Sequence, residues 1–159
     1  MKISIIGVGK LKEEYWKDAV KEYSKRLSRY CQLAIDDVDE VKGSDNINES
    51  EKMSILKGEG ENILKKIKKD SFLIALDIKG TKFSSDQLSN KINELGIMGK
   101  SNITFVIGGS LGLSPEILEL ANLKLSFSDM TFPHQMMKVI LLEQIYRSYK
   151  IISNETYHK

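Results

Sequence analysis

The chain has 159 residues, of which 41% are hydrophobic and 29% are charged. This composition is typical of one globular domain and excludes intrinsic disorder. With 24 lysines and arginines against 22 acidic residues, the net charge of +2 does not indicate nucleic-acid binding, so any RNA-binding face must be local.

Strand and helix patterns alternate from the first residues onward. Apolar, β-rich runs predict strands, and apolar residues at three- and four-residue spacing predict amphipathic helices. In the first half of the chain these patterns place strands at 3–8 and 33–38 and helices at 16–30 and 49–69. The acidic, glycine-containing stretch 39–48 is predicted to be a mobile loop. Gly58 and Gly60 are expected to bend or break the second helix.

The second half of the chain continues the alternation. The patterns place strands at 72–76, 103–107 and 123–127 and helices at 84–95, 115–122 and 133–152. Ser84 with Gln87 three residues later is typical of a capping box, and Ser114 followed by Pro115 is typical of a helix start. Pro133 suits the first turn of the last helix, where its missing N–H would have no partner.

Five such alternations with continuous apolar strands predict one α/β domain spanning 1–159. We expect a mainly parallel sheet of five to six strands with helices on both faces. Ligands of such sheets bind beyond the carboxyl ends of the strands. Three of these ends carry unusual loops, at 76–80, 108–112 and 127–132, and we expect them to converge on one pocket.

Other functional classes find little support in the sequence. The single Cys31 cannot form an internal disulfide and favours a reducing compartment. No apolar run approaches the roughly 20 residues of a membrane span, and the N-terminal run is too short for a signal peptide. Two histidines and one cysteine at unrelated spacings form no metal cluster. We therefore expect a cytoplasmic protein without a metal or a membrane partner.

Two glycine-rich loops permit alternative interpretations. Gly7 and Gly9 resemble the start of a dinucleotide-binding motif, but the third glycine position is Lys12, which favours a plain strand-to-helix turn. The loop 108–112 lacks the Lys-Ser/Thr ending of a triphosphate-binding loop. It either allows a flat ligand such as adenine to approach the backbone or is a simple turn.

The C-terminal quarter is the best local candidate for an RNA-binding face. It combines Lys138, Arg147 and Lys150 with a tail that holds an aromatic ring, an imidazole and a cation. A frayed, solvated terminus is the alternative. The apolar surface of the last helix is wider than one core face requires, which suggests a second contact, such as another subunit. His134 is a candidate acid or base, or a ring buried in the helix start.

Several strings together resemble one known family. They are VGKLKEEY, LDIKG, FVIGGSLGL, LSFSDMTFPHQMMKVILLEQIYRSYKI and the terminal TYHK. The chain is identified by them as similar to the bacterial ribosomal RNA large subunit methyltransferase H family, of the SPOUT class. The resemblance covers the chain from Lys2 to Lys159.

The resemblance implies an S-adenosylmethionine-dependent enzyme that methylates N3 of pseudouridine 1915 in helix 69 of 23S rRNA on the assembled ribosome. It also implies a C-terminal trefoil knot and a homodimer with a shared active site, with no metal and no DNA partner. A non-catalytic ribosome-binding or assembly factor that retains the fold is the alternative. A nucleotide- or NAD-dependent enzyme, which would depend on Gly7 and Gly9, is a third interpretation.

By position, the resemblance also implies the site residues. Those expected to bind S-adenosylmethionine are Leu76, Gly108, Phe127, Ser128, Asp129, Met130, Thr131 and Phe132. Those expected to act in RNA binding and catalysis are Arg147, Tyr157, His158 and Lys159. Among them His158 is the candidate base, and Arg147 or Lys159 would stabilise charge. Pro133 and His134 are then expected to shape the turn.

Overall fold

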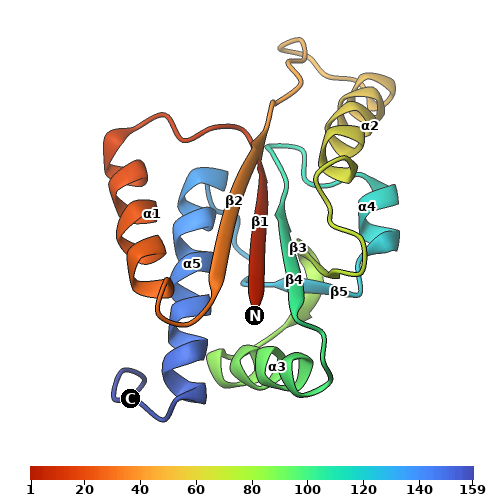
Figure 1. Ribbon diagram of the computed structural model, residues 1–159. Helices are drawn as coiled ribbons and strands as arrows, with labels where there is room; N and C mark the ends of the chain where they lie inside the picture. The colour runs from red at the N-terminus through yellow and green to blue at the C-terminus, as the bar shows by residue number, and fades with distance from the viewer.

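A five-stranded parallel sheet forms the centre of the computed structural model, which describes residues 1–159 (Figure 1). The strand order is β2-β1-β4-β3-β5. The strands are β1 (Lys2–Val8), β2 (Gln32–Val38), β3 (Phe72–Lys82), β4 (Asn102–Ile107) and β5 (Leu123–Ser126). All four pairings between neighbours are parallel, which confirms the predicted sheet and sets its number of strands at five.

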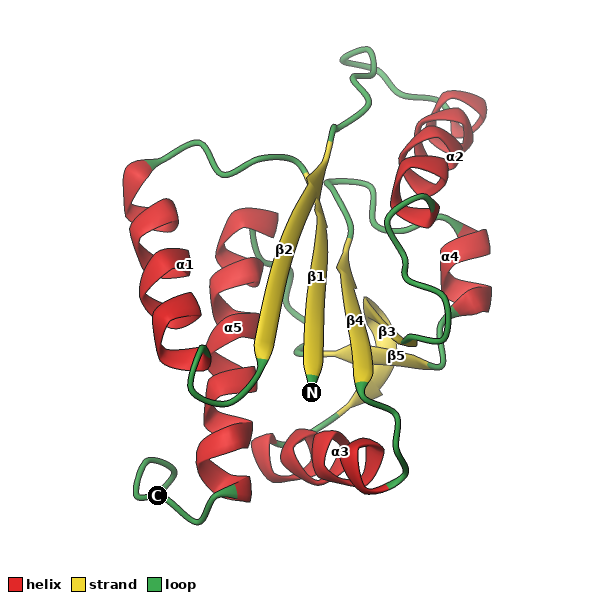
Figure 2. Ribbon diagram, viewed as in Figure 1, coloured by secondary structure: helices red, strands yellow, loops and turns green.

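Helices cover both faces of this sheet (Figure 2). One face carries α1 (Glu14–Leu27), α3 (Ser85–Ile97) and α5 (His134–Ile152), and the other carries α2 (Glu49–Leu64) and α4 (Pro115–Leu120). The sheet has a hydrophobic core on each face, and alternate residues of β1 pack into one core or the other. Ile3 and Ile5 pack toward the α1, α3 and α5 side, whereas Ile6 and Val8 pack toward α2 and α4. The apolar strands are therefore continuous because both of their faces are buried.

The helix α2 corrects one prediction, because it runs unbroken through Gly58 and Gly60. A methyl group on Gly60 would lie 2.6 Å from the Ser114 side-chain oxygen, so glycine lets α2 approach the start of α4 closely. Close packing therefore explains why residue 60 is a glycine. The contact with Ser114 outweighs the weak helix propensity of glycine. The helix ends at Leu64, five residues earlier than expected.

The strand β3 corrects another prediction. The sequence indicated a turn after Leu76, but the strand continues to Lys82 with a register shift against β5 between Leu76 and Thr81. A methyl group on Gly80 would lie 2.6 Å from the backbone of Lys124. Glycine is thus required where the irregular part of β3 approaches β5.

The predicted helix starts are confirmed. Ser84 and Gln87 form the reciprocal capping box of α3, and Ser114 caps α4 with Pro115 at its first position. Pro133 lies immediately before α5, and the stretch 39–48 contains no helix or strand before Glu49. None of the helices is both long enough and apolar enough to cross a bilayer.

The only cysteine offers a direct test of this packing. Partial burial between α1 and β2 raises the pKa of the Cys31 thiol to about 11. The folded protein therefore holds about 100-fold less reactive thiolate at pH 8 than an unfolded chain with an ordinary thiol. We expect iodoacetamide labelling to accelerate by about that factor in denaturant. Equal labelling rates in the folded and unfolded protein would contradict the burial of Cys31.

Candidate active site

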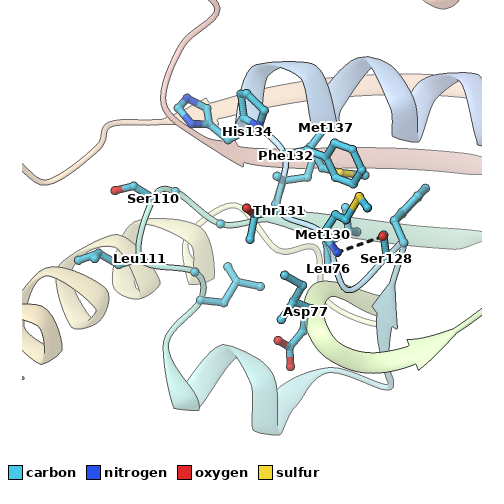
Figure 3. A pocket seen from close by; sticks show the side chains of 18 of the residues that line it. Leu76, Asp77, Ser110, Leu111, Ser128, Met130, Thr131, Phe132, His134 and Met137 are labelled. Carbon is cyan, nitrogen blue, oxygen red and sulfur yellow. Dashed lines mark hydrogen bonds between the residues drawn. The ribbon is translucent and has the colours of Figure 1, made fainter.

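The three segments expected to converge do meet, at a cavity of about 730 Å³ (Figure 3). Residues 76–78 in the middle of β3 and the loops after β4 and β5 line it. The start of α5 closes it through Pro133, His134 and Met137. Seven of the eight residues expected to bind a cofactor line this cavity: Leu76, Gly108, Phe127, Ser128, Met130, Thr131 and Phe132. Its volume lies within the range of about 300–1,000 Å³ that is common for small-molecule sites.

Asp129 is the exception among these eight residues. It does not line the cavity, and its carboxylate pairs with Lys82 at 2.5 Å. Both side chains are exposed, so the pair adds little to stability. Asp129 therefore ties the loop after β5 to the end of β3.

Asp77 is a lining residue that the sequence analysis did not select. It is the only acidic residue of the cavity, whose lining includes no lysine or arginine. Its Oδ1 accepts a hydrogen bond of 3.2 Å from the backbone N–H of Lys79. The signal that could have identified it was its position directly after Leu76, where the predicted strand 72–76 ended. The charges of this cavity therefore suit a cationic ligand.

The backbone of the loop after β5, which lines the cavity, has no regular hydrogen bonds. From Ser128 to Phe132 no backbone group pairs with another backbone group. Side chains make the internal contacts instead: the Met130 N–H donates to the Ser128 hydroxyl at 3.0 Å (Figure 3), and the Ser126 hydroxyl donates to the Ser128 carbonyl at 3.2 Å. The remaining N–H and C=O groups of the loop are available to a ligand.

Glycine is required in the loop after β4. A methyl group on Gly108 would lie 2.5 Å from the carbonyl oxygen of Gly112, and Gly112 itself has a φ of +85°. The Gly112 N–H donates to the Gly109 carbonyl at 3.1 Å, which closes a tight turn. The loop is thus a compact wall of backbone that leaves the cavity open to a flat ligand.

Gly7 and Gly9 serve the start of α5 rather than a dinucleotide. A methyl group on Gly7 would lie 3.1 Å from the Lys138 side chain, and one on Gly9 would lie 2.9 Å from His134 Nε2. Gly9 has a φ of +88°, and the nearby Lys12 N–H donates to the Gln135 side chain at 2.7 Å. Both glycines therefore accommodate side chains of α5, and His134 packs against the turn as expected.

Lys138 does not belong to an RNA-binding face, which corrects that prediction. Its residue exposure is 2%, and its ammonium forms an ion pair with Asp37 at the end of β2. Lys150 is also engaged, in an ion pair with Glu155, whose carboxylate accepts a hydrogen bond from Tyr30 at 2.9 Å. These two cations stabilise the position of α5 and the approach to the tail.

The predicted catalytic residues Arg147, Tyr157 and His158 do lie together, around a carboxylate that the sequence analysis missed. Glu143 accepts hydrogen bonds from Arg147 Nη2 at 2.6 Å and from the Tyr157 hydroxyl at 3.1 Å. The Arg147 guanidinium lies over the Tyr157 ring, 4.7 Å from its centre. The spacing of Glu143 and Arg147 by four residues on one helix was the signal for this pair.

His158 closes the cluster. Its Nδ1 lies 3.2 Å from Arg147 Nη1, and its Nε2 lies 3.7 Å from the carboxylate of Asp86. Since arginine only donates, a hydrogen bond at this contact requires Nδ1 to accept and the ring proton to lie on Nε2. Lys159 follows His158 directly, is exposed and makes no ion pair with Glu143 or Asp86.

Glu143 raises the pKa values of two other residues of the cluster. The hydrogen bond to its carboxylate raises the pKa of Arg147 above its usual value, and partial burial together with Glu143 raises the pKa of Tyr157. Both groups therefore keep their protons at neutral pH. About 20 Å of helix separates this cluster from His134 at the rim of the cavity.

Comparisons with known proteins agree on one family. Residues 1–158 match the family described as "Predicted SPOUT methyltransferase". The chain is 59% identical to ribosomal RNA large subunit methyltransferase H from Clostridium tetani and 51% identical to the protein of the same name from Acetivibrio thermocellus. Both alignments extend over 159 residues and cover 100% of each protein.

Solved structures share the fold at low sequence identity. A putative methylase family protein from Neisseria gonorrhoeae has a TM-score of 0.55 at 12% identity, covering 99% of this chain and 86% of that one. A putative methyltransferase from Legionella pneumophila, solved with bound SAM, has a TM-score of 0.50 at 14% identity, covering 94% of this chain and 66% of that one.

Proposed function

The chain belongs to the SPOUT methyltransferase family, and we propose that it transfers the methyl group of S-adenosylmethionine to N3 of pseudouridine 1915 in helix 69 of 23S rRNA. We propose that the substrate is the assembled ribosome in the cytoplasm. The names of the relatives support a large-subunit rRNA substrate. The observation that carries the proposal is the cavity in which residues 76–78 of β3 meet the loops after β4 and β5.

The cavity fits S-adenosylmethionine on three grounds. The unpaired backbone groups of 128–132 are donors and acceptors for an adenine and a ribose. The turn at Gly108 and Gly112 allows a flat ring to approach the backbone. Asp77 supplies the only carboxylate, which would face the positive charge of the ligand. When bound, S-adenosylmethionine supplies a methyl group activated by its sulfonium.

Methyl transfer to an imide nitrogen also requires removal of its proton. The N3 atom would bond to the methyl carbon as the carbon–sulfur bond breaks and its electron pair returns to sulfur. We propose that the N3 proton passes to Nδ1 of His158, which lies 3.2 Å from Arg147 Nη1 and would accept a hydrogen bond from it. The Arg147 N–H that now occupies Nδ1 would then face the developing negative charge of the imide.

We propose further that the protein acts as a homodimer. Large apolar side chains are exposed at the rim of the cavity, with Met130 at 74%, Ile78 at 41% and Phe132 at 40%. A second copy would cover them.

The decisive experiment follows label from the methyl group of S-adenosylmethionine. The protein is incubated with the labelled donor and separately with free rRNA, isolated large subunits and whole ribosomes. We expect saturable donor binding and label in 23S rRNA only with ribosomes, at N3 of the stated pseudouridine. Ribosome binding without label transfer would instead identify a non-catalytic factor that retains the fold.

A further inference from the structure

A second, smaller cavity of about 280 Å³ adjoins the first. It lies between the start of α3, the end of β5 and the middle of α5, and it shares Leu125 and Phe127 with the cofactor cavity. These two residues therefore border both spaces. The second cavity contains none of the other residues assigned above to cofactor binding.

The walls of this cavity are aromatic and its polar groups are uncharged. Phe83 and Phe127 contribute flat rings, and Ser85, Ser126 and Gln144 contribute two hydroxyls and an amide. Such walls stack on a nucleobase, while hydroxyl and amide groups read its polar edge. A uracil-type base presents two N–H donors and two carbonyl acceptors, which match this set of groups.

A continuous set of contacts connects the second cavity with the predicted catalytic residues. The Ser85 hydroxyl donates to Gln144 Oε1 at 2.7 Å, and Gln144 Nε2 donates to Glu143 Oε2 at 2.9 Å. Glu143 in turn holds Arg147 and Tyr157. His158 closes the ring of contacts through Asp86, the neighbour of Ser85 in the sequence. The cavity thus lies between the cofactor site and the groups expected to handle the proton.

We propose that the second cavity receives the pyrimidine base of the acceptor nucleotide, with Gln144 and Ser85 at its polar edge. This inference rests on the proposed function. A base taken out of its RNA stack would enter between the rings of Phe83 and Phe127. Held at the boundary formed by Leu125 and Phe127, its reacting nitrogen would face the cofactor cavity on one side and the tail on the other.

Two substitutions at Ser85 test the proposal by size. Ser85→Leu fills the cavity and is expected to lower kcat/KM for ribosomes about 100-fold, as expected when a reacting group loses its place. Ser85→Ala leaves the space open and should stay within about fivefold of the wild type, the loss of one neutral hydrogen bond. Ser50→Leu, also in the first turn of a helix but exposed on α2, is the matched control and should retain full activity.

Gln144→Met tests the recognition of the base independently of space. It keeps the length of the side chain and removes the amide, so kcat/KM should fall about tenfold or more. The dissociation constant for S-adenosylmethionine, measured by calorimetry, should remain that of the wild type in all four variants. The melting temperature of each variant identifies any variant that fails to fold. If Ser85→Leu does not fold, Gln144→Met still tests the proposal.

The outcomes separate the two proposals. Wild-type kcat/KM for both Ser85→Leu and Gln144→Met would overturn the assignment of the base to this cavity. A parallel loss of S-adenosylmethionine affinity would also overturn it, because the cavity would then belong to the cofactor site. Failure of the wild-type protein to bind the donor or methylate ribosomes would overturn the proposed function itself, before any variant is made.

Discussion

Alanine in place of Arg147 is expected to lower kcat for ribosome methylation about 100- to 1,000-fold, the loss seen when one preorganised donor to a developing anion is removed. The guanidinium is fixed by Glu143 and by the Tyr157 ring, so it is held in place before the substrate arrives. Arg147→Lys keeps the charge but not the planar fork, and should recover only part of the rate. Single-turnover assays with saturating S-adenosylmethionine measure the chemical step directly.

Arg26 provides the matched control for this prediction. It is another helical arginine in a four-residue ion pair, with Glu22, and its guanidinium lies 5.4 Å from the centre of the Tyr23 ring. It belongs to α1 and does not touch His158. Arg26→Ala should leave kcat near the wild-type value, whereas an Arg147→Ala enzyme with normal kcat would remove Arg147 from the mechanism.

Asp37→Ala should produce the largest loss of stability, about 3–5 kcal/mol, because it leaves a buried cation without its partner. The Lys138 side chain is only 3% exposed, against 27% for Asp37. In the folded protein the ammonium is therefore balanced by Asp37 rather than by water. Equilibrium unfolding in urea measures the change, provided that unfolding remains two-state.

The opposite substitution should be milder. Lys138→Met keeps most of the apolar stem and leaves a carboxylate that water partly reaches, so we expect less than half of the loss caused by Asp37→Ala. The double variant should recover much of the stability, since neither charge remains. Additive losses in the double variant would show that the two side chains are not coupled.

The elements were predictable because their signals are local. The apolar runs of the strands, the capping box at Ser84 and the proline at the start of α4 all act within a few residues. The predictions that were wrong concern places where segments distant in the sequence pack together. Gly60 fits against Ser114, and Gly80 fits against Lys124, and neither contact leaves a trace in the spacing of apolar residues.

The candidate site was predictable only in part. Strand ends and glycines pointed to the cofactor cavity, but the pairing of Lys138 with Asp37 joins residues 101 positions apart in the sequence. The polar groups of the second cavity belong to three separate segments, and nothing in the sequence around any of them indicates a binding site. They are Ser85, Ser126 and Gln144. The knotted C-terminal fold follows from family membership, since periodicity carries no information about a knot.

The position of α5 has a consequence for biosynthesis. Side chains of the first strand, Ile3 and Ile5, share a core with Leu141, Leu142 and Ile145 of the last helix. During translation β1 emerges before all the other helices and strands of the domain, whereas α5 emerges after all of them. One apolar face of the nascent sheet therefore stays only partly covered, by α1 and α3, until α5 has been synthesised. Chains truncated before α5 should be bound by chaperones or aggregate.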